Sequence, residues 1–167
     1  MRLTERRRAR IIEVIGDPLR CLNVIAETNA TSQYSPDLRV VGVDGSSAQS
    51  KAAFAAVLRS HKRNASRIPA SVSHVIAVVE PPAQNEPWAF ANVHRWAMSI
   101  HRRIQRARGI DADVTVLLVD RDTYPDLILE RIEELAQRPP GVNPAAVHTM
   151  REIRSCSIAQ ASTNDFI

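Results

Sequence analysis

The sequence predicts an α/β protein with an open, mostly parallel sheet of about four strands, helices on both faces and an N-terminal helical extension. Apolar runs of strand length alternate with amphipathic segments of helix length, which is typical of parallel sheets. At 167 residues, 44% hydrophobic and 24% charged, the chain can bury one core. We assign residues 1–37 to the extension and residues 38–167 to the α/β domain. An α+β sheet with some antiparallel pairing is the alternative.

The extension is expected to be helical. A first helix spans Thr4–Gly16, because Ile12 and Ile15 lie on one helical face and glycine commonly ends a helix. A second, short helix begins at Asp17 and has apolar residues at helical spacing as far as Ile25.

Three strands and three helices are expected in the middle of the chain. The strands are Leu38–Asp44, Val72–Val79 and Val114–Val119, each an almost continuous apolar run of the kind that is covered on both faces. The helices are Ser47–Arg63, Asn85–Arg108 and a third helix that begins with a capping box formed by Thr123 and Asp126. Beyond them we expect a short helix from Asn143 and a last strand over Ile153–Ala161.

Charge is distributed unevenly along the chain. Residues up to Arg108 include 17 basic and 8 acidic side chains, whereas those from Gly109 onward include 5 basic and 10 acidic. Such asymmetry favours head-to-tail docking of copies or contact with a polyanion. The expected partners are therefore copies of the chain or a larger protein assembly, with nucleic acid as a candidate for the basic N-terminal half. A structural subunit of a virion or phage tail is one functional hypothesis.

No membrane partner is expected, because no apolar run approaches the length of a membrane span. The expected location is the cytoplasm, or a virion if the chain is an assembly subunit. Cys21 and Cys156 stand in no metal-binding spacing, and five scattered histidines do not complete a zinc site. Two free thiols and one disulfide are both compatible with this pattern.

The first predicted strand ends in an Asp44-Gly45 corner that leads into a helix. In open α/β sheets such corners border the ligand crevice. Acidic residues end the other strands as well, at Glu80, Asp120 and Asp122. Converging carboxylates could hold Mg²⁺, so an RNase H-like nuclease is a second alternative, although acidic residues also serve as turn formers and helix caps.

Catalytic motifs are missing from the sequence. It has no Gly-x-x-x-x-Gly-Lys-Ser/Thr loop, no Gly-x-Gly-x-x-Gly fingerprint and no Gly-x-Ser-x-Gly elbow. We therefore expect a binding protein rather than an enzyme, and we assign neither catalytic residues nor metal ligands.

Three stretches carry a family resemblance. Val40–Ser46, His74–Pro82 and Ile104–Leu135 are similar in pattern to the universal stress protein family. The resemblance implies a parallel α/β fold that binds ATP and acts by binding and oligomerising. By position, the implied contacts to an adenine nucleotide are Asp44, Gly45, Ser46 and Val119. The glycine-rich phosphate loop of that family should follow Ala136, where this chain instead has prolines and one glycine.

Overall fold

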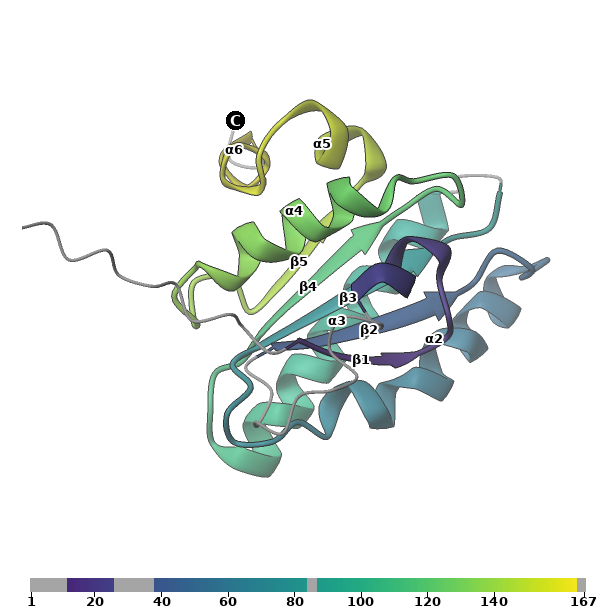
Figure 1. Ribbon diagram of the computed structural model, residues 1–167. Helices are drawn as coiled ribbons and strands as arrows, with labels where there is room; N and C mark the ends of the chain where they lie inside the picture. Colours follow the sequence, from purple (N-terminus) through teal and green to yellow (C-terminus); the bar gives the residue numbers. More distant parts are fainter. Residues whose placement is uncertain (1–11, 26–37, 84–86, 165–167) are drawn as a thin grey trace, which may run out of the picture.

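The computed structural model describes residues 12–25, 38–83 and 87–164, which form a single sheet with helices on both faces (Figure 1). The sheet has five strands in the order β1-β2-β3-β4-β5, and every pair of neighbours is parallel. The strands are β1 (Ile12–Gly16), β2 (Leu38–Asp44), β3 (His74–Glu80), β4 (Asp113–Leu118) and β5 (Ala145–His148). The α/β class is confirmed, with one more strand than predicted and with parallel pairing throughout the described part.

Helices cover the two faces unequally. α2 (Lys51–Ser66) and α3 (Pro87–Arg108) lie on one face, which we call the α2–α3 face. The other face carries the short 3-10 helix η1 (Arg20–Leu22), α4 (Pro125–Ala136), α5 (Met150–Ser155) and α6 (Ile158–Asn164).

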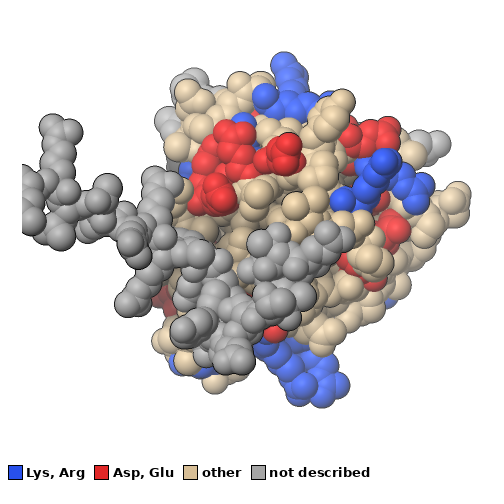
Figure 2. Space-filling model, viewed as in Figure 1, with Lys and Arg blue, Asp and Glu red and all other residues tan. Residues whose placement is uncertain are grey.

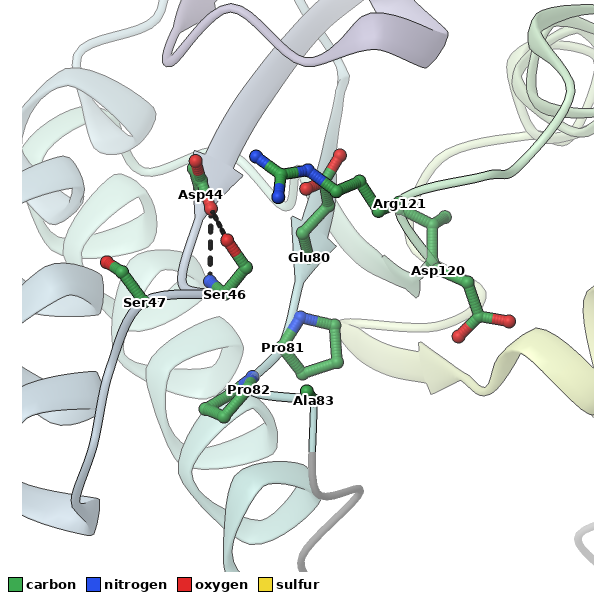
Figure 3. Close-up of a pocket in the computed structure, with 10 residues that line it drawn as sticks. Asp44, Ser46, Ser47, Glu80, Pro81, Pro82, Ala83, Asp120 and Arg121 are labelled. Carbon is green, nitrogen blue, oxygen red and sulfur yellow. Dashed lines mark hydrogen bonds between the residues drawn. The ribbon is translucent and has the colours of Figure 1, made fainter.

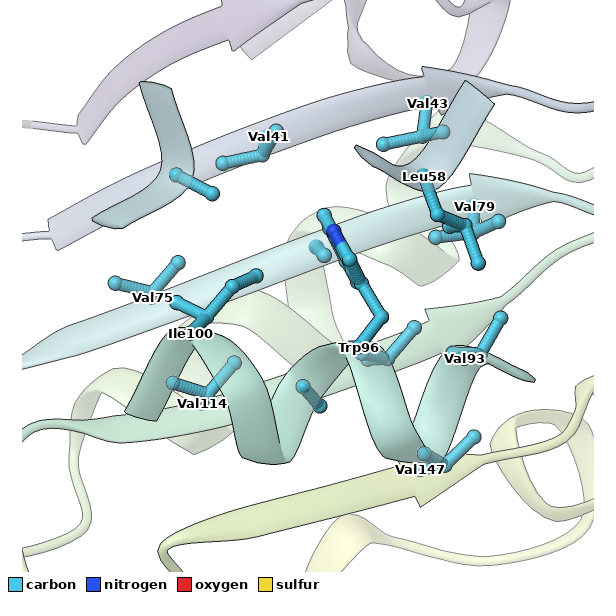
Figure 4. Close-up of a cluster of buried hydrophobic side chains, with 14 of the residues drawn as sticks. Val41, Val43, Leu58, Val75, Val79, Val93, Trp96, Ile100, Val114 and Val147 are labelled. Atoms are coloured by element: carbon cyan, nitrogen blue, oxygen red, sulfur yellow. The ribbon is translucent and has the colours of Figure 1, made fainter. Parts of the chain in front are cut away.

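Two hydrophobic clusters, one on each face of the sheet, form the core. Side chains alternate along each central strand, so each of these strands supplies both clusters. On the α2–α3 face, Trp96 and Ile100 of α3 and Leu58 of α2 pack against Val41 and Val79 (Figure 4). This two-sided burial explains why the central strands are continuously apolar.

The N-terminal segment differs from the prediction. Ile12–Gly16 is the edge strand β1, not the end of a helix, and it pairs in register with the first five residues of β2. The apolar spacing of Ile12 and Ile15 suits a helix equally well, and pairing with β2 decides between the two. The following segment does turn helically and buries Leu19, Leu22 and Ile25. Residues 1–11 and 26–37 lie outside the described residues.

The C-terminal segment also differs. The short helix expected from Asn143 is instead β5, and the strand expected over Ile153–Ala161 is instead the two helices α5 and α6. The expected capping box at Thr123 does not form, because Tyr124 is the N-cap of α4 and makes no side-chain capping bond. A capping box does begin α5, where Thr149 and Glu152 bond each other's backbone N–H groups.

The connections between strands are not all of one hand. Strand order advances in one direction from β1 to β5. α2 and α3 cross on one face and α4 crosses on the other, so the β4–α4–β5 connection has the opposite hand to the two before it. Crossovers between parallel strands are right-handed as a general rule, and the described part of this sheet does not follow that rule throughout.

Candidate functional site

A crevice lies at the carboxyl ends of β3 and β4, where the chain leaves the sheet in opposite directions. After β3 the chain turns toward α3, and after β4 it turns toward α4 on the other face. Diverging connections leave the strand ends uncovered, which is how parallel sheets form ligand crevices.

The crevice contains a cavity of about 510 Å³ bounded by the loops that follow β2, β3 and β4 (Figure 3). It is lined by Asp44, Ser46, Ser47, Glu80, Pro81, Pro82, Ala83, Val119, Asp120 and Arg121. Three of the four residues predicted for the site therefore line one cavity: Asp44, Ser46 and Val119. The fourth, Gly45, shapes its wall.

Gly45 is required by packing. A Cβ atom at this position would lie 2.3 Å from Cε2 of Phe54 and 3.0 Å from the carbonyl oxygen of Glu80. Its N–H donates to that same carbonyl at 2.9 Å and joins the end of β2 to the end of β3. The glycine thus lets the β2 loop pass between the Phe54 ring and β3.

Asp44 organises the loop that follows β2. Its Oδ1 accepts hydrogen bonds from the Ser46 N–H at 3.0 Å and from Ser46 Oγ at 2.6 Å (Figure 3). The Ser46 hydroxyl, helped by its N–H and by the positive charge of Arg121, lowers the pKa of the Asp44 carboxyl. Asp44 is therefore an ionised acceptor at neutral pH.

Glu80 lies beside Asp44, because the two residues are register partners on neighbouring strands. Only 5% of Glu80 is exposed. Burial, followed by the negative charge of Asp44, raises the pKa of the Glu80 carboxyl, and Arg121 partly opposes this effect. The Arg121 side chain extends toward Glu80 and Asp44 from the loop after β4 (Figure 3). The two carboxyls of the pair thus have pKa values that move apart.

The other two strand-end acids do not join this pair. The Asp120 side chain is 56% exposed, contacts Arg154 at 3.3 Å and points away from Glu80 (Figure 3). Asp122 does not line the cavity, although its charge contributes to the raised pKa of Glu80. Within the described residues, no group of three or more histidine, cysteine or acidic side chains is arranged to hold a metal ion.

Several backbone N–H groups around the cavity are used by the protein itself. The N–H of Val119 donates to the carbonyl of Val79 at 2.9 Å, and that of Ala48 donates to Gly45 at 3.1 Å. The Gly45 and Ser46 N–H groups have the internal acceptors described above. A phosphate cradle needs several backbone N–H groups that point at the ligand, and those of Gly45, Ser46 and Val119 do not contribute to one because they already have acceptors.

The helix after the corner also begins away from the cavity. α2 starts at Lys51 with Ser50 as its N-cap, where the Ser50 side chain accepts the N–H of Ala53 at 3.1 Å. No residue of α2 lines the cavity. The helix predicted from Ser47 therefore begins four residues later, at Lys51, and residues 45–50 form a loop between β2 and α2.

Sequence reasoning did not assign Arg121, Pro81 or Pro82 to the site. Each lies within three residues of the end of β3 or β4, so the parallel arrangement itself was the signal that could have identified them. The two prolines fix the backbone at the exit of β3, and Pro82 is buried.

The exposed charges differ between the faces. Carboxylates gather over α4 on the face shown in Figure 2, and they include Asp126, Glu130 and Glu133. Both cysteines are free thiols, and burial raises the pKa of the Cys21 thiol to about 11.

Among the described helices, none is both long enough and apolar enough to cross a membrane. Comparison of the chain with protein-family models, with curated proteins and with solved structures finds no match.

Proposed function

We propose that the protein is a non-catalytic binding protein that holds a small, hydrogen-bond-donating ligand in the cavity at the carboxyl ends of β2, β3 and β4. The observation that carries this proposal is the lining of the cavity, which includes three acidic residues, Asp44, Glu80 and Asp120, and a single cation, Arg121, that extends toward Asp44 and Glu80. Pockets with a few convergent polar groups and shifted pKa values are the usual binding sites of α/β proteins.

Charge selects the class of ligand. Carboxylates accept hydrogen bonds from hydroxyl and amino groups and repel phosphate, and the N–H groups of Gly45, Ser46 and Val119 are already bonded within the protein. A nucleoside, whose ribose hydroxyls can donate to Asp44, is the form of the nucleotide hypothesis that the site supports. ATP would place its triphosphate against two or three carboxylates and one guanidinium.

Thermal shift measurements with adenosine, AMP and Mg²⁺–ATP test this proposal. A ligand that binds only the folded state raises the melting temperature. We expect adenosine at millimolar concentration to raise it, and each added phosphate to reduce the shift. Asp44→Asn should abolish the shift, and the control Asp126→Asn on α4 should retain it. No shift with any of the three ligands would refute the proposal, and a larger shift with ATP would refute its charge argument.

Two other functions remain proposals with their own tests. The uneven charge of the two faces supports an assembly subunit. Light scattering at high protein concentration should then detect oligomers of defined size, and a monomer would contradict this function.

An RNase H-like nuclease would need Mg²⁺-dependent cleavage that Asp44→Asn abolishes. We expect no cleavage, because the Asp120 carboxylate points away from Asp44 and Glu80.

A further inference from the structure

A strongly basic surface covers the side of the protein formed by α2 and α3. These two helices contain nine lysine and arginine residues and no acidic residue. Eight exposed arginines lie on them or directly after them: Arg59, Arg63, Arg67, Arg95, Arg102, Arg103, Arg106 and Arg108. We call these eight residues the basic surface.

The fold concentrates these charges at one end. Both helices connect parallel strands, so both run from the carboxyl edge of the sheet back to its amino edge, and they pack side by side. Their C-terminal halves, which carry seven of the eight arginines, therefore meet at the amino edge, opposite the cavity. From Arg95 to Arg108 the helix rises roughly 20 Å, and neighbouring helix axes lie roughly 10 Å apart.

No carboxylate of the described residues neutralises this surface. None of the eight arginines forms an ion pair within the described part of the chain, whereas Arg39, Arg131 and Arg154 elsewhere each contact a carboxylate. Arg95 and Arg108 hydrogen-bond uncharged groups, the side chain of Asn92 and the carbonyl of Ile68 respectively. Favourable interactions with the two helix C-termini account for the last turn of each helix but not for Arg59 or Arg95.

We propose that the basic surface binds the phosphate backbone of double-stranded nucleic acid without reading its sequence. A duplex presents a dense, regular row of negative charges that can meet several arginines at once. The acidic patch over α4 is a poorer match, because its three exposed carboxylates would leave most of the eight arginines unpaired. Base stacking is not required, since the surface consists of guanidinium groups.

Fluorescence anisotropy with a labelled 30-base-pair DNA duplex of arbitrary sequence, titrated at several salt concentrations, tests this proposal. We expect binding that weakens steeply with salt and is equal for two unrelated sequences. Arg103→Gln/Arg106→Gln should weaken binding roughly tenfold or more at low salt and reduce the slope of log K against log salt by about 2. The four positions in this test and its control are exposed, so all variants should keep the wild-type melting temperature.

The matched control is Arg20→Gln/Arg151→Gln, which removes the same charge from exposed positions on the opposite face. It should leave affinity and salt slope nearly unchanged, as should Asp44→Asn in the cavity. Three results would overturn the proposal: no binding by the wild type at low salt, an equal loss in the control pair, or binding that is insensitive to salt. Copies that associate and are separated by Glu130→Gln/Glu133→Gln, with no DNA binding, would instead assign the surface to a second copy.

Discussion

The sheet has two places where neighbouring strands lead into connections on opposite faces and leave a gap between the strand ends. One gap is filled by the protein and the other stays open. The chain leaves β1 and β2 toward opposite faces, and it does so again at β3 and β4. The first gap is filled: Asp17 accepts the N–H of Asp44 at 2.8 Å, contacts His61 Nε2 at 2.9 Å and donates its own N–H to Gly42. The second gap remains open as the cavity. Diverging connections create a gap, and local packing decides whether it becomes a site.

The backbones of Gly42 and Asp17 pack closely together in the first gap. Gly42→Ala should disturb this contact and have the largest effect on stability of the changes considered. A Cβ atom on Gly42 would lie 2.3 Å from the carbonyl oxygen of Asp17, which is backbone and cannot simply rotate away. We expect a loss of about 2–3 kcal/mol in the free energy of unfolding by urea denaturation, the upper part of the usual range for forced overpacking.

The control for this change is Gly109→Ala. Gly109 has a φ of 65° but has open space around its Cβ position, so the cost there is conformational and about 1 kcal/mol. Equal losses for the two variants would contradict the role of close approach at Gly42.

Removing the side chain that fills the first gap should have the next largest effect. Asp17→Ala leaves the Asp44 N–H without its acceptor and removes the contact with His61, for an expected loss of about 1–2 kcal/mol. The corresponding change at the open gap, Asp120→Ala, should cost no more than about 0.5 kcal/mol because its contact with Arg154 is exposed. Urea denaturation measures both losses. A larger loss for Asp120→Ala than for Asp17→Ala would contradict the description of the first gap as filled and the second as open.

The smallest effects concern the paired carboxyls at the open gap, whose contributions to stability should depend on pH in opposite ways. The pKa of Glu80 is raised in the folded state, so ionising Glu80 costs stability as pH rises from its ordinary value of 4.5 through the folded value. Glu80→Gln should therefore raise the melting temperature at pH 7, and this gain should disappear below about pH 4.5.

The pKa of Asp44 is lowered, so its contribution is present above its ordinary value of 3.8 and is lost as pH falls through the folded value. Asp44→Asn should lower the melting temperature at pH 7, and this effect should shrink as pH falls below 3.8. Differential scanning calorimetry from pH 3 to pH 8 measures both variants. Parallel pH profiles for the two variants would contradict the opposite environments assigned to these carboxyls.

The middle of the fold was predictable because its signals are local and strong. Leu38–Asp44 is correct to the residue, and Arg108 is the correct end of α3, because a continuous apolar run and a helix-ending glycine leave few alternatives. The edge strands were not predictable in the same way. β1 and β5 are short, and pairing with β2 and β4 stabilises them more than their own sequence does. The Thr149–Glu152 capping box was a readable signal for a helix, but we expected a strand over Ile153–Ala161 instead.

The candidate site was predictable only in part. Acidic strand ends identified Asp44 and its neighbours, and parallel pairing does bring Asp44 beside Glu80. The direction of each side chain was not available from the sequence, so Asp120 was expected to converge and does not. The side of the sheet on which α4 crosses was also unpredictable, and that choice opens the gap between β3 and β4.

The most direct test of the open crevice is an NMR titration of ¹⁵N-labelled protein with adenosine. We predict that amide shifts change in the loops that border the cavity, at residues 44–47, Glu80, Ala83 and residues 119–121, and that the amides around Asp17 in the closed gap stay unchanged. Shift changes centred on Asp17 or on the basic surface, with none in these loops, would contradict the assignment of the cavity as the binding site.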